Sequence, residues 1–148
     1  MNIEKIMSKS VVIVEMDDSL KMVKEIFDNT RFHHLLVVES GKLFGVISDR
    51  DLLKALSPNI GTAAETTGEA ATLNKRVHQI MTRKPVTLAP NAGIYDAIEI
   101  FNSYKISCIP VVDDERKPIG IISWRDILRA LESNRGKHPN NANQQGRS

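Results

Sequence analysis

Two seven-residue stretches contain the side chains of this sequence that are best suited to hold a ligand. They are GVISDRD at positions 45–51 and GIISWRD at positions 120–126. Each combines a serine that can begin a helix with an arginine that can pair with phosphate. Each ends on an aspartate that can accept hydrogen bonds from two adjacent sugar hydroxyls. Because a helix start also presents unpaired N–H groups and positive dipole, such a turn has the parts of a ribose-phosphate site.

A helix cap is a simpler explanation for the same residues. In a capping box, a serine bonds the backbone of the third helical residue, and an acid at that residue bonds back to the serine. The pairs with this spacing are Ser48–Asp51 and Ser123–Asp126. The glycine three residues before each serine favours a ligand, because glycine lets another backbone or a ligand approach a strand closely. The sequence leaves both interpretations open.

Both stretches belong to an internal duplication of the chain. At an offset of 74 residues, Met7 aligns with Met81. After one extra residue in a polar turn the offset becomes 75, and Gly45 aligns with Gly120. Turns tolerate insertions better than the elements that they connect. Self-similarity of this kind predicts two copies of one structural unit.

Each copy is predicted to fold as strand, helix, strand, strand and helix. Short runs of β-forming residues predict first strands at 11–14 and 86–88. Asp17 and Asn91 are suited to cap the helices that follow, in which apolar residues recur at helical spacing. The runs LLVV and CIPVV are each joined by a polar turn to a second apolar run, which predicts β-hairpins. The last helices begin at the serines of the two stretches.

The chain divides into repeats at 1–57 and 76–132, joined by a linker at 58–75 whose second half is helix-capable. Residues 133–148 are polar and without periodicity, which predicts a disordered tail. A unit of about 60 residues buries only about 60% of its unfolded surface and is marginal alone. We therefore expect the two repeats to pack together.

Charge and composition exclude several classes of protein. The net charge is +2, but three cations lie in the tail, and the remainder has 17 basic and 18 acidic residues. Without a clustered basic face, nucleic-acid binding is not expected. No apolar run approaches 18 residues, so no membrane association is expected. The absence of a signal-like apolar segment and the single Cys108 fit a cytoplasmic location.

The sequence has no recognisable catalytic or metal-binding motif. It contains no P-loop, no G-x-G-x-x-G and no G-x-S-x-G. Cys108 lies in an apolar strand pattern with no base nearby, which indicates an inert core residue. His33 and His34 lack the spacing of metal ligands and are either phosphate contacts or surface polarity at a strand end. We expect no enzyme activity, no catalytic cofactor and no metal.

The duplicated pattern resembles a tandem pair of CBS domains, the cystathionine β-synthase type. It is carried by IMSKSVVIV, HHLLVV and GKLFGVISDRDLL, repeated as IMTRKPVTL, CIPVV and GIISWRDIL. The stand-alone layout is similar to small bacterial pairs of the acetoin-utilisation type. The resemblance implies an α+β module of two pseudo-twofold related repeats whose sheets pack face to face. It also implies a non-enzymatic sensor that binds AMP, ADP, ATP or S-adenosylmethionine in two inter-repeat clefts and signals to a partner protein or through a homodimer.

The resemblance assigns roles to residues by position. Asp51 and Asp126 would hold ribose hydroxyls, the serines would contact ribose or phosphate, and the arginines would reach phosphate. The backbone of the first two strands of each repeat would bind adenine. The residues implied to bind the ligand are Val12, Ile13, His34, Leu35, Ser48, Arg50, Asp51, Val86, Thr87, Cys108, Ile109, Pro110, Ser123, Arg125 and Asp126.

Two differences between the repeats predict unequal clefts. Leu36 stands where the second repeat has Pro110, and Asp49 stands where it has Trp124. An extra carboxylate beside a phosphate site disfavours anions, so we expect the Asp126 site to bind better. The alternative function is a ligand-independent structural or interaction protein in which the Ser-x-x-Asp pairs are only helix caps.

Overall fold

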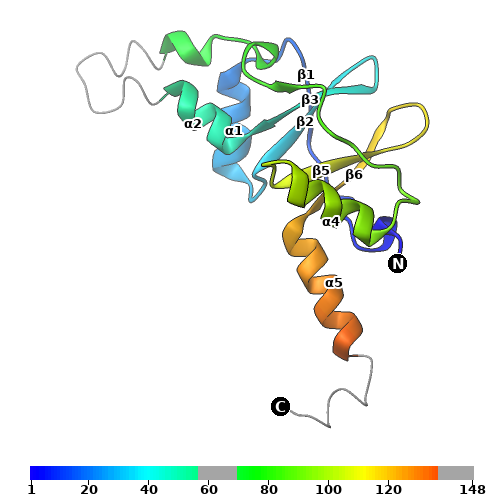
Figure 1. Cartoon of the computed structure of the whole chain (residues 1–148). Helices are drawn as coiled ribbons and strands as arrows, with labels where there is room; N and C mark the ends of the chain where they lie inside the picture. The colour runs from blue at the N-terminus through cyan, green and yellow to red at the C-terminus, as the bar shows by residue number, and fades with distance from the viewer. Residues whose placement is uncertain (57–69, 137–148) are drawn as a thin grey trace.

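The computed structural model describes residues 1–56 and 70–136 (Figure 1). The first repeat contains η1 (Ile3–Lys5), β1 (Ile13–Glu15), α1 (Leu20–Asn29), β2 (His34–Glu39), β3 (Lys42–Ser48) and α2 (Asp49–Leu56). The second contains η3 (Val77–Gln79), β4 (Thr82–Arg83), α4 (Ile94–Ser103), β5 (Cys108–Val112), β6 (Pro118–Ser123) and α5 (Trp124–Gly136). This order confirms the predicted α+β class.

The two sheets have the same plan. One sheet has the order β1-β2-β3-β4, with β1 parallel to β2 and the other pairs antiparallel. The other consists of β5 and β6, flanked by isolated bridges that Leu88 and Ser8 make to its two strands. The predicted strand at 86–88 is therefore wrong except at Leu88, which alone of these residues pairs with β5. Pro85 and Pro90, which lack backbone N–H groups, leave too little pairing for a strand there.

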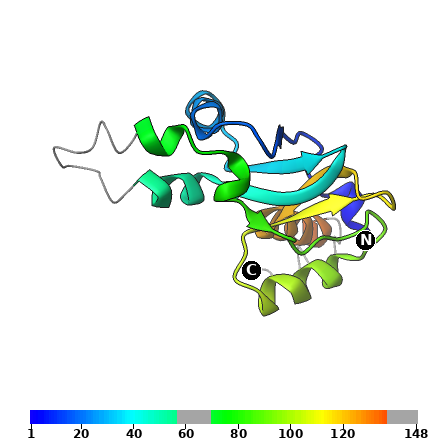
Figure 2. The ribbon, with the colours of Figure 1, turned by 90° about the horizontal axis from the view of Figure 1, so that it is seen from above.

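The two hairpins pack face to face, as Figure 2 shows. Their shared core contains Leu36, Leu43 and Val46 from the first hairpin and Cys108 and Val112 from the second. The hairpin tips are also joined, because the Leu43 N–H donates to the Arg116 carbonyl at 2.9 Å and the Arg116 side chain donates to the Leu43 carbonyl at 3.0 Å. The face-to-face packing implied by the sequence is confirmed.

The first helix of each repeat begins two residues later than predicted. The N-cap of α1 is Ser19, whose hydroxyl accepts from the Met22 N–H at 3.2 Å. The N-cap of α4 is Gly93, whose N–H donates to the Asp96 carboxylate at 2.9 Å. Asp17 lies outside α1 and caps nothing there. Its neighbour Asp18 instead accepts from the Glu15 N–H at 2.7 Å and shapes the turn before the helix.

Helical residues occur in both of the segments predicted to lie outside the repeats. The described part of the helix-capable half of the linker is helical at 70–73 and then turns before η3. Helix α5 continues to Gly136, four residues into the predicted tail, and no proline interrupts it there. The rest of the predicted linker and tail, 58–69 and 137–148, lies outside the described residues.

The segment that opens each repeat packs in the core of the other repeat. Ile3 is fully buried among residues of the second repeat such as Ile109, and its N–H donates to the Ala92 carbonyl at 2.9 Å. Val77 is fully buried in the core of the first repeat, and its N–H donates to the Asp18 carbonyl at 2.8 Å. The two units are thus interlocked, and neither has its complete core within one repeat of the sequence.

Candidate ligand-binding clefts

The glycines of the two Gly-to-Asp stretches are where the crossing segments approach most closely. A Cβ on Gly45 would lie 2.8 Å from the carbonyl oxygen of Thr82 and 2.6 Å from the sulfur of Met81. A Cβ on Gly120 would lie 2.5 Å from the sulfur of Met7. These glycines therefore admit another backbone segment, which is one of the two reasons that the sequence left open for them.

Gly45→Ala should destabilise the protein by about 1–3 kcal/mol, because the new methyl meets a backbone carbonyl that cannot move independently. Gly120→Ala should cost less, because its methyl would lie 3.0 Å from the Ser8 carbonyl oxygen, rather than 2.8 Å from a carbonyl as at Gly45, and the side chain of Met7 can shift. Gly93→Ala is the matched control, since its nearest neighbour would be at 3.6 Å. Urea denaturation compares the three, and equal midpoints for Gly45→Ala and Gly93→Ala would contradict the close approach.

The serine and aspartate of each stretch form a capping box. Asp51 Oδ2 accepts from the Ser48 N–H at 2.8 Å, and the Ser48 hydroxyl accepts from the Asp51 N–H at 3.1 Å. The second repeat has the same pair of bonds at 2.8 and 3.2 Å. Only one carboxylate oxygen of Asp51 is used in this way within the described residues. Because a carboxylate has about four acceptor positions, the cap and a ligand can share it.

Two clefts lie at the starts of α2 and α5. The Asp51 cleft, of about 410 Å³, is lined by His34, Val46, Ser48, Arg50, Asp51, Lys54, Thr82, Lys84, Pro85, Val86, Tyr104, Lys105, Ile106, Ser107, Cys108 and Pro110. The Asp126 cleft, of about 390 Å³, is lined by Ser8, Ser10, Arg31, Phe32, His33, His34, Cys108, Ile121, Ser123, Trp124, Arg125 and Asp126. Each cleft combines the helix start of one repeat with strand and loop residues of the other, at a size that suits a small ligand.

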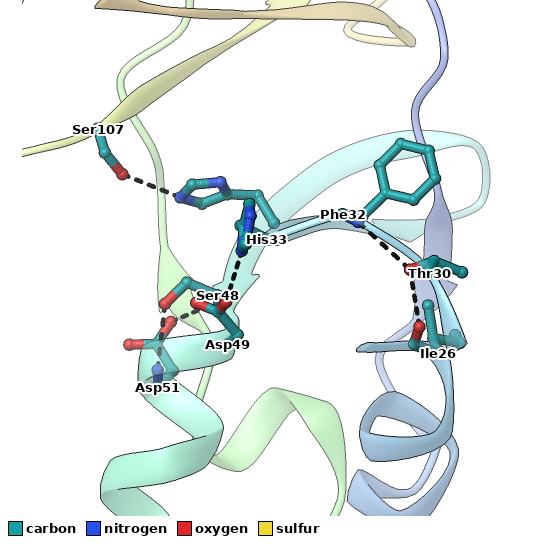
Figure 3. Close-up of polar contacts among 9 residues, drawn as sticks. Ile26, Thr30, Phe32, His33, Ser48, Asp49, Asp51 and Ser107 are labelled. Carbon is teal, nitrogen blue, oxygen red and sulfur yellow. Dashed lines mark hydrogen bonds and ion pairs between the residues drawn. The ribbon is translucent and has the colours of Figure 1, made fainter. Parts of the chain in front are cut away.

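His34 and Cys108 separate the two clefts, since both residues line both. The ring of His34 bonds the Ser107 hydroxyl across the repeats at 3.0 Å (Figure 3). Burial lowers the pKa of His34, outweighing the Asp49 charge that raises it, so the imidazole is mainly neutral at neutral pH. Burial raises the pKa of the Cys108 thiol to about 12, which keeps it protonated and a poor nucleophile.

Asp49 does not line the Asp51 cleft. Its carboxylate lies 2.7 Å from Nδ1 of His33 (Figure 3). Both residues border a larger hollow, of about 750 Å³, between α1, α2 and the start of α5. The charge that was expected to weaken anion binding beside Asp51 is therefore directed elsewhere. Trp124 borders the Asp126 cleft and is 49% exposed, so a ligand ring can reach it.

Ten of the residues predicted to bind a ligand line the two clefts. They are His34, Ser48, Arg50, Asp51, Val86, Cys108, Pro110, Ser123, Arg125 and Asp126. Leu35 and Ile109 are fully buried in the repeat cores, and the Val12 carbonyl accepts from the Leu36 N–H within the sheet. Ile13 lies on β1 and is not among the residues that line either cleft, and Thr87 borders a separate hollow.

Sequence reasoning did not identify the basic residues beside the Asp51 cleft, namely Lys54, Lys84 and Lys105. It also missed Ser8, Ser10 and Arg31 beside the Asp126 cleft. The duplication contains the signal that would have found some of them. At the offset of 74, Lys84 aligns with Ser10 and Lys105 with Arg31, so these positions occupy equivalent places in the two clefts.

Known proteins share this two-repeat fold. The family model for the CBS domain matches residues 3–58 and 77–133. CBSX2 of Arabidopsis thaliana, solved in complex with AMP, superposes with a TM-score of 0.75 at 26% identity over 90% of this chain and 98% of that one. The CBS domain pair of protein MJ0100, solved with 5-methylthioadenosine and S-adenosyl-L-methionine, has a TM-score of 0.73 at 29% identity over 88% and 99%.

A CBS domain-containing protein of Dictyostelium discoideum is 30% identical over 87% of this chain and 90% of its own length. Other curated relatives are longer. The L-aspartate semialdehyde sulfurtransferase of Methanosarcina acetivorans is 30% identical, but the match spans only 23% of it. Within 1–56 and 70–136, no helix is both long and apolar enough to cross a membrane.

Proposed function

This chain belongs to the CBS domain family, and on that premise we propose that it is a regulatory module that binds adenosine compounds in its two inter-repeat clefts. The ligand class is AMP, ADP, ATP or S-adenosylmethionine. The module carries no catalysis of its own and passes the state of its clefts to a partner protein or to a second copy. The chain spans less than half of several curated relatives, so their activities are not assigned to it.

The observation that supports this proposal most strongly is that the two clefts are built in the same way. Each places the Ser-x-x-Asp turn of one repeat opposite the strands of the other, with an arginine beside the aspartate. The turn offers a carboxylate to ribose hydroxyls and a helix start to phosphate. The apolar residues that line the rest of each cleft offer a surface for adenine. CBSX2 binds AMP, and the MJ0100 pair binds S-adenosyl-L-methionine, which supports the same ligand class here.

Isothermal titration with AMP, ADP, ATP, S-adenosylmethionine and NADH tests the proposal. At least one adenosine compound should bind to the wild type, and nucleotide should be recovered unhydrolysed afterwards. If none binds, the capping boxes favour the alternative, a ligand-independent interaction protein whose Ser-x-x-Asp turns serve only as caps. Hydrolysis by the purified chain would instead contradict the absence of catalysis.

We further propose a homodimer that covers the exposed face of α5. Trp124, Leu128 and Leu131 are 49, 55 and 39% exposed at helical spacing, and α5 extends away from the sheets (Figure 1). An apolar stripe of this kind favours a partner surface. Light scattering at micromolar concentration should give the mass of a dimer, and Leu128→Glu should give a monomer. A monomeric wild type, with and without nucleotide, would contradict the dimer.

A further inference from the structure

The two clefts differ in charge although they are built on one plan. Counting lysine, arginine and carboxylate side chains, the Asp51 cleft is lined by four cations and one anion, namely Arg50, Lys54, Lys84, Lys105 and Asp51. The Asp126 cleft is lined by two cations and one anion, namely Arg31, Arg125 and Asp126. The excess of positive charge is thus larger in the Asp51 cleft, and clefts concentrate the field of the charges that line them.

From this difference we propose that the clefts select adenosine compounds by charge. The Asp51 cleft prefers compounds with more phosphate groups, and the Asp126 cleft binds adenosine with or without phosphates with little preference. Lys84 is the residue that determines this specificity. The inference rests on the proposed function, because it divides the same ligand class between the two sites.

We assign this role to Lys84 because the duplication supplies a direct comparison within the same chain. The equivalent position in the Asp126 cleft is Ser10, which is uncharged and also lines its cleft. The other cations of the Asp51 cleft have a cationic counterpart in the second repeat. Lys54 aligns with Arg129, whose guanidinium lies 3.9 Å from the Asp126 carboxylate. Arg50 is matched by Arg125, and Lys105 is matched by Arg31. Exchanging lysine and serine at this one position therefore changes the charge of either cleft without altering the shared turn.

The backbone at Lys84 is also unusual. Its φ is +50°, whereas the other non-glycine residues with positive φ in the described part of the chain, Ser40 and Arg116, lie in hairpin turns. A left-handed conformation costs a residue with a side chain about 1–2 kcal/mol, and such strain persists where surrounding structure imposes it. Here the Lys84 N–H donates to the Phe44 carbonyl at 3.3 Å and Pro85 follows, which fixes the lysine at the edge of the Asp51 cleft.

The test is titration of adenosine, AMP, ADP and ATP into two variants that each keep one cleft intact. Asp126→Asn leaves the Asp51 cleft, and affinity there should rise from adenosine to ATP. Asp51→Asn leaves the Asp126 cleft, where the four affinities should be similar. Asparagine keeps a carbonyl oxygen for the cap, and the thermal midpoint of each variant verifies the fold.

Lys84→Ser and Ser10→Lys complete the experiment at two exposed positions, and their thermal midpoints are measured in the same way. At low salt, Lys84→Ser should reduce the preference of the Asp51 cleft for ATP over adenosine about tenfold, the scale of one charge-assisted hydrogen bond. Ser10→Lys should create such a preference in the Asp126 cleft. Both effects should shrink as salt rises, because exposed charges are screened.

The possible failures are distinguishable. If adenosine and ATP bind the Asp51 cleft equally, or if Lys84→Ser leaves their ratio unchanged, selection by charge is wrong while adenosine binding stands. If the Asp126 cleft prefers ATP to adenosine while Ser10 is unchanged, the proposed difference in specificity between the two clefts is wrong. If no compound binds in either variant or in the wild type, the proposed function itself fails.

Discussion

A fragment of residues 1–70 is expected to show no cooperative thermal transition as a monomer. It ends before Val77 and Met81, which are buried in the core of the first repeat with Val14, Leu35 and Ile47. Removing two large apolar side chains from one core costs several kcal/mol, which is comparable to the whole stability of so small a unit. The fragment also keeps Ile3 without the core that buries it.

A second fragment, which begins and ends later in the sequence, provides the control. A fragment of residues 9–83 is of similar length, omits Ile3 and includes every residue of the first core, from Val12 to Met81. Its remaining exposed apolar surface is the hairpin face of Leu36 and Leu43, which the second repeat normally covers. We expect it to unfold cooperatively, with a midpoint that rises with concentration because that face pairs with another copy.

Circular dichroism at several concentrations compares the two fragments, and mixing 1–70 with 71–148 should restore a transition. A cooperative, monomeric 1–70 would show that the crossing segments are dispensable. An unfolded 9–83 at every concentration would show that the covered hairpin face, rather than the crossing segment, is what each half lacks.

The duplication made much of this fold predictable. Once Gly45 was aligned with Gly120, the two hairpins and the last helices followed from apolar runs and from serines at the right spacing. The capping boxes were predictable for the same reason, because Ser-x-x-Asp is a local pattern that needs no distant partner. Features that depend on neighbouring residues along the chain were thus available from the sequence.

Features that depend on distant contacts were not. The exchange of opening segments joins Ile3 to Ile109 and Val77 to Leu35, and an apolar residue alone does not indicate which core buries it. The direction of Asp49 toward His33 likewise depends on how β2 meets α2. Asp17 and Ser19 are both residue types that suit an N-cap, and the turn bonded by Asp18 is what places the helix start at Ser19.

The second large effect is expected from the aspartates of the two clefts. If Asp126 holds ribose hydroxyls, Asp126→Ala removes a hydrogen bond to a charged group, worth roughly 1.5–3 kcal/mol, and weakens binding at least about tenfold. Removing one ribose hydroxyl from the nucleotide should weaken binding to the wild type. It should cause little further loss of affinity in the mutant, because the mutant already lacks the carboxylate that binds this hydroxyl. Asp51→Ala should behave comparably for the ligand of its own cleft, since Asp49 is directed toward His33.

The capping interpretation predicts a different result, and the structure provides the variant that separates the two. Asp126→Ala also removes the bond from the Ser123 N–H at 2.8 Å, so it should lose about 0.5–2 kcal/mol of stability in either case. Asp126→Asn keeps an oxygen for that bond while removing the charge that favours the hydroxyls. Binding that falls in both variants, with stability lost mainly in the alanine variant, would assign the carboxylate to the ligand.

Equal binding of ribose and deoxyribose compounds by the wild type would mean that these aspartates are caps and that the nucleotide assignment is wrong. The decisive data are the double cycle of mutation against deoxy-ligand and the melting temperature of every variant, because affinity and stability then respond to different atoms of one side chain.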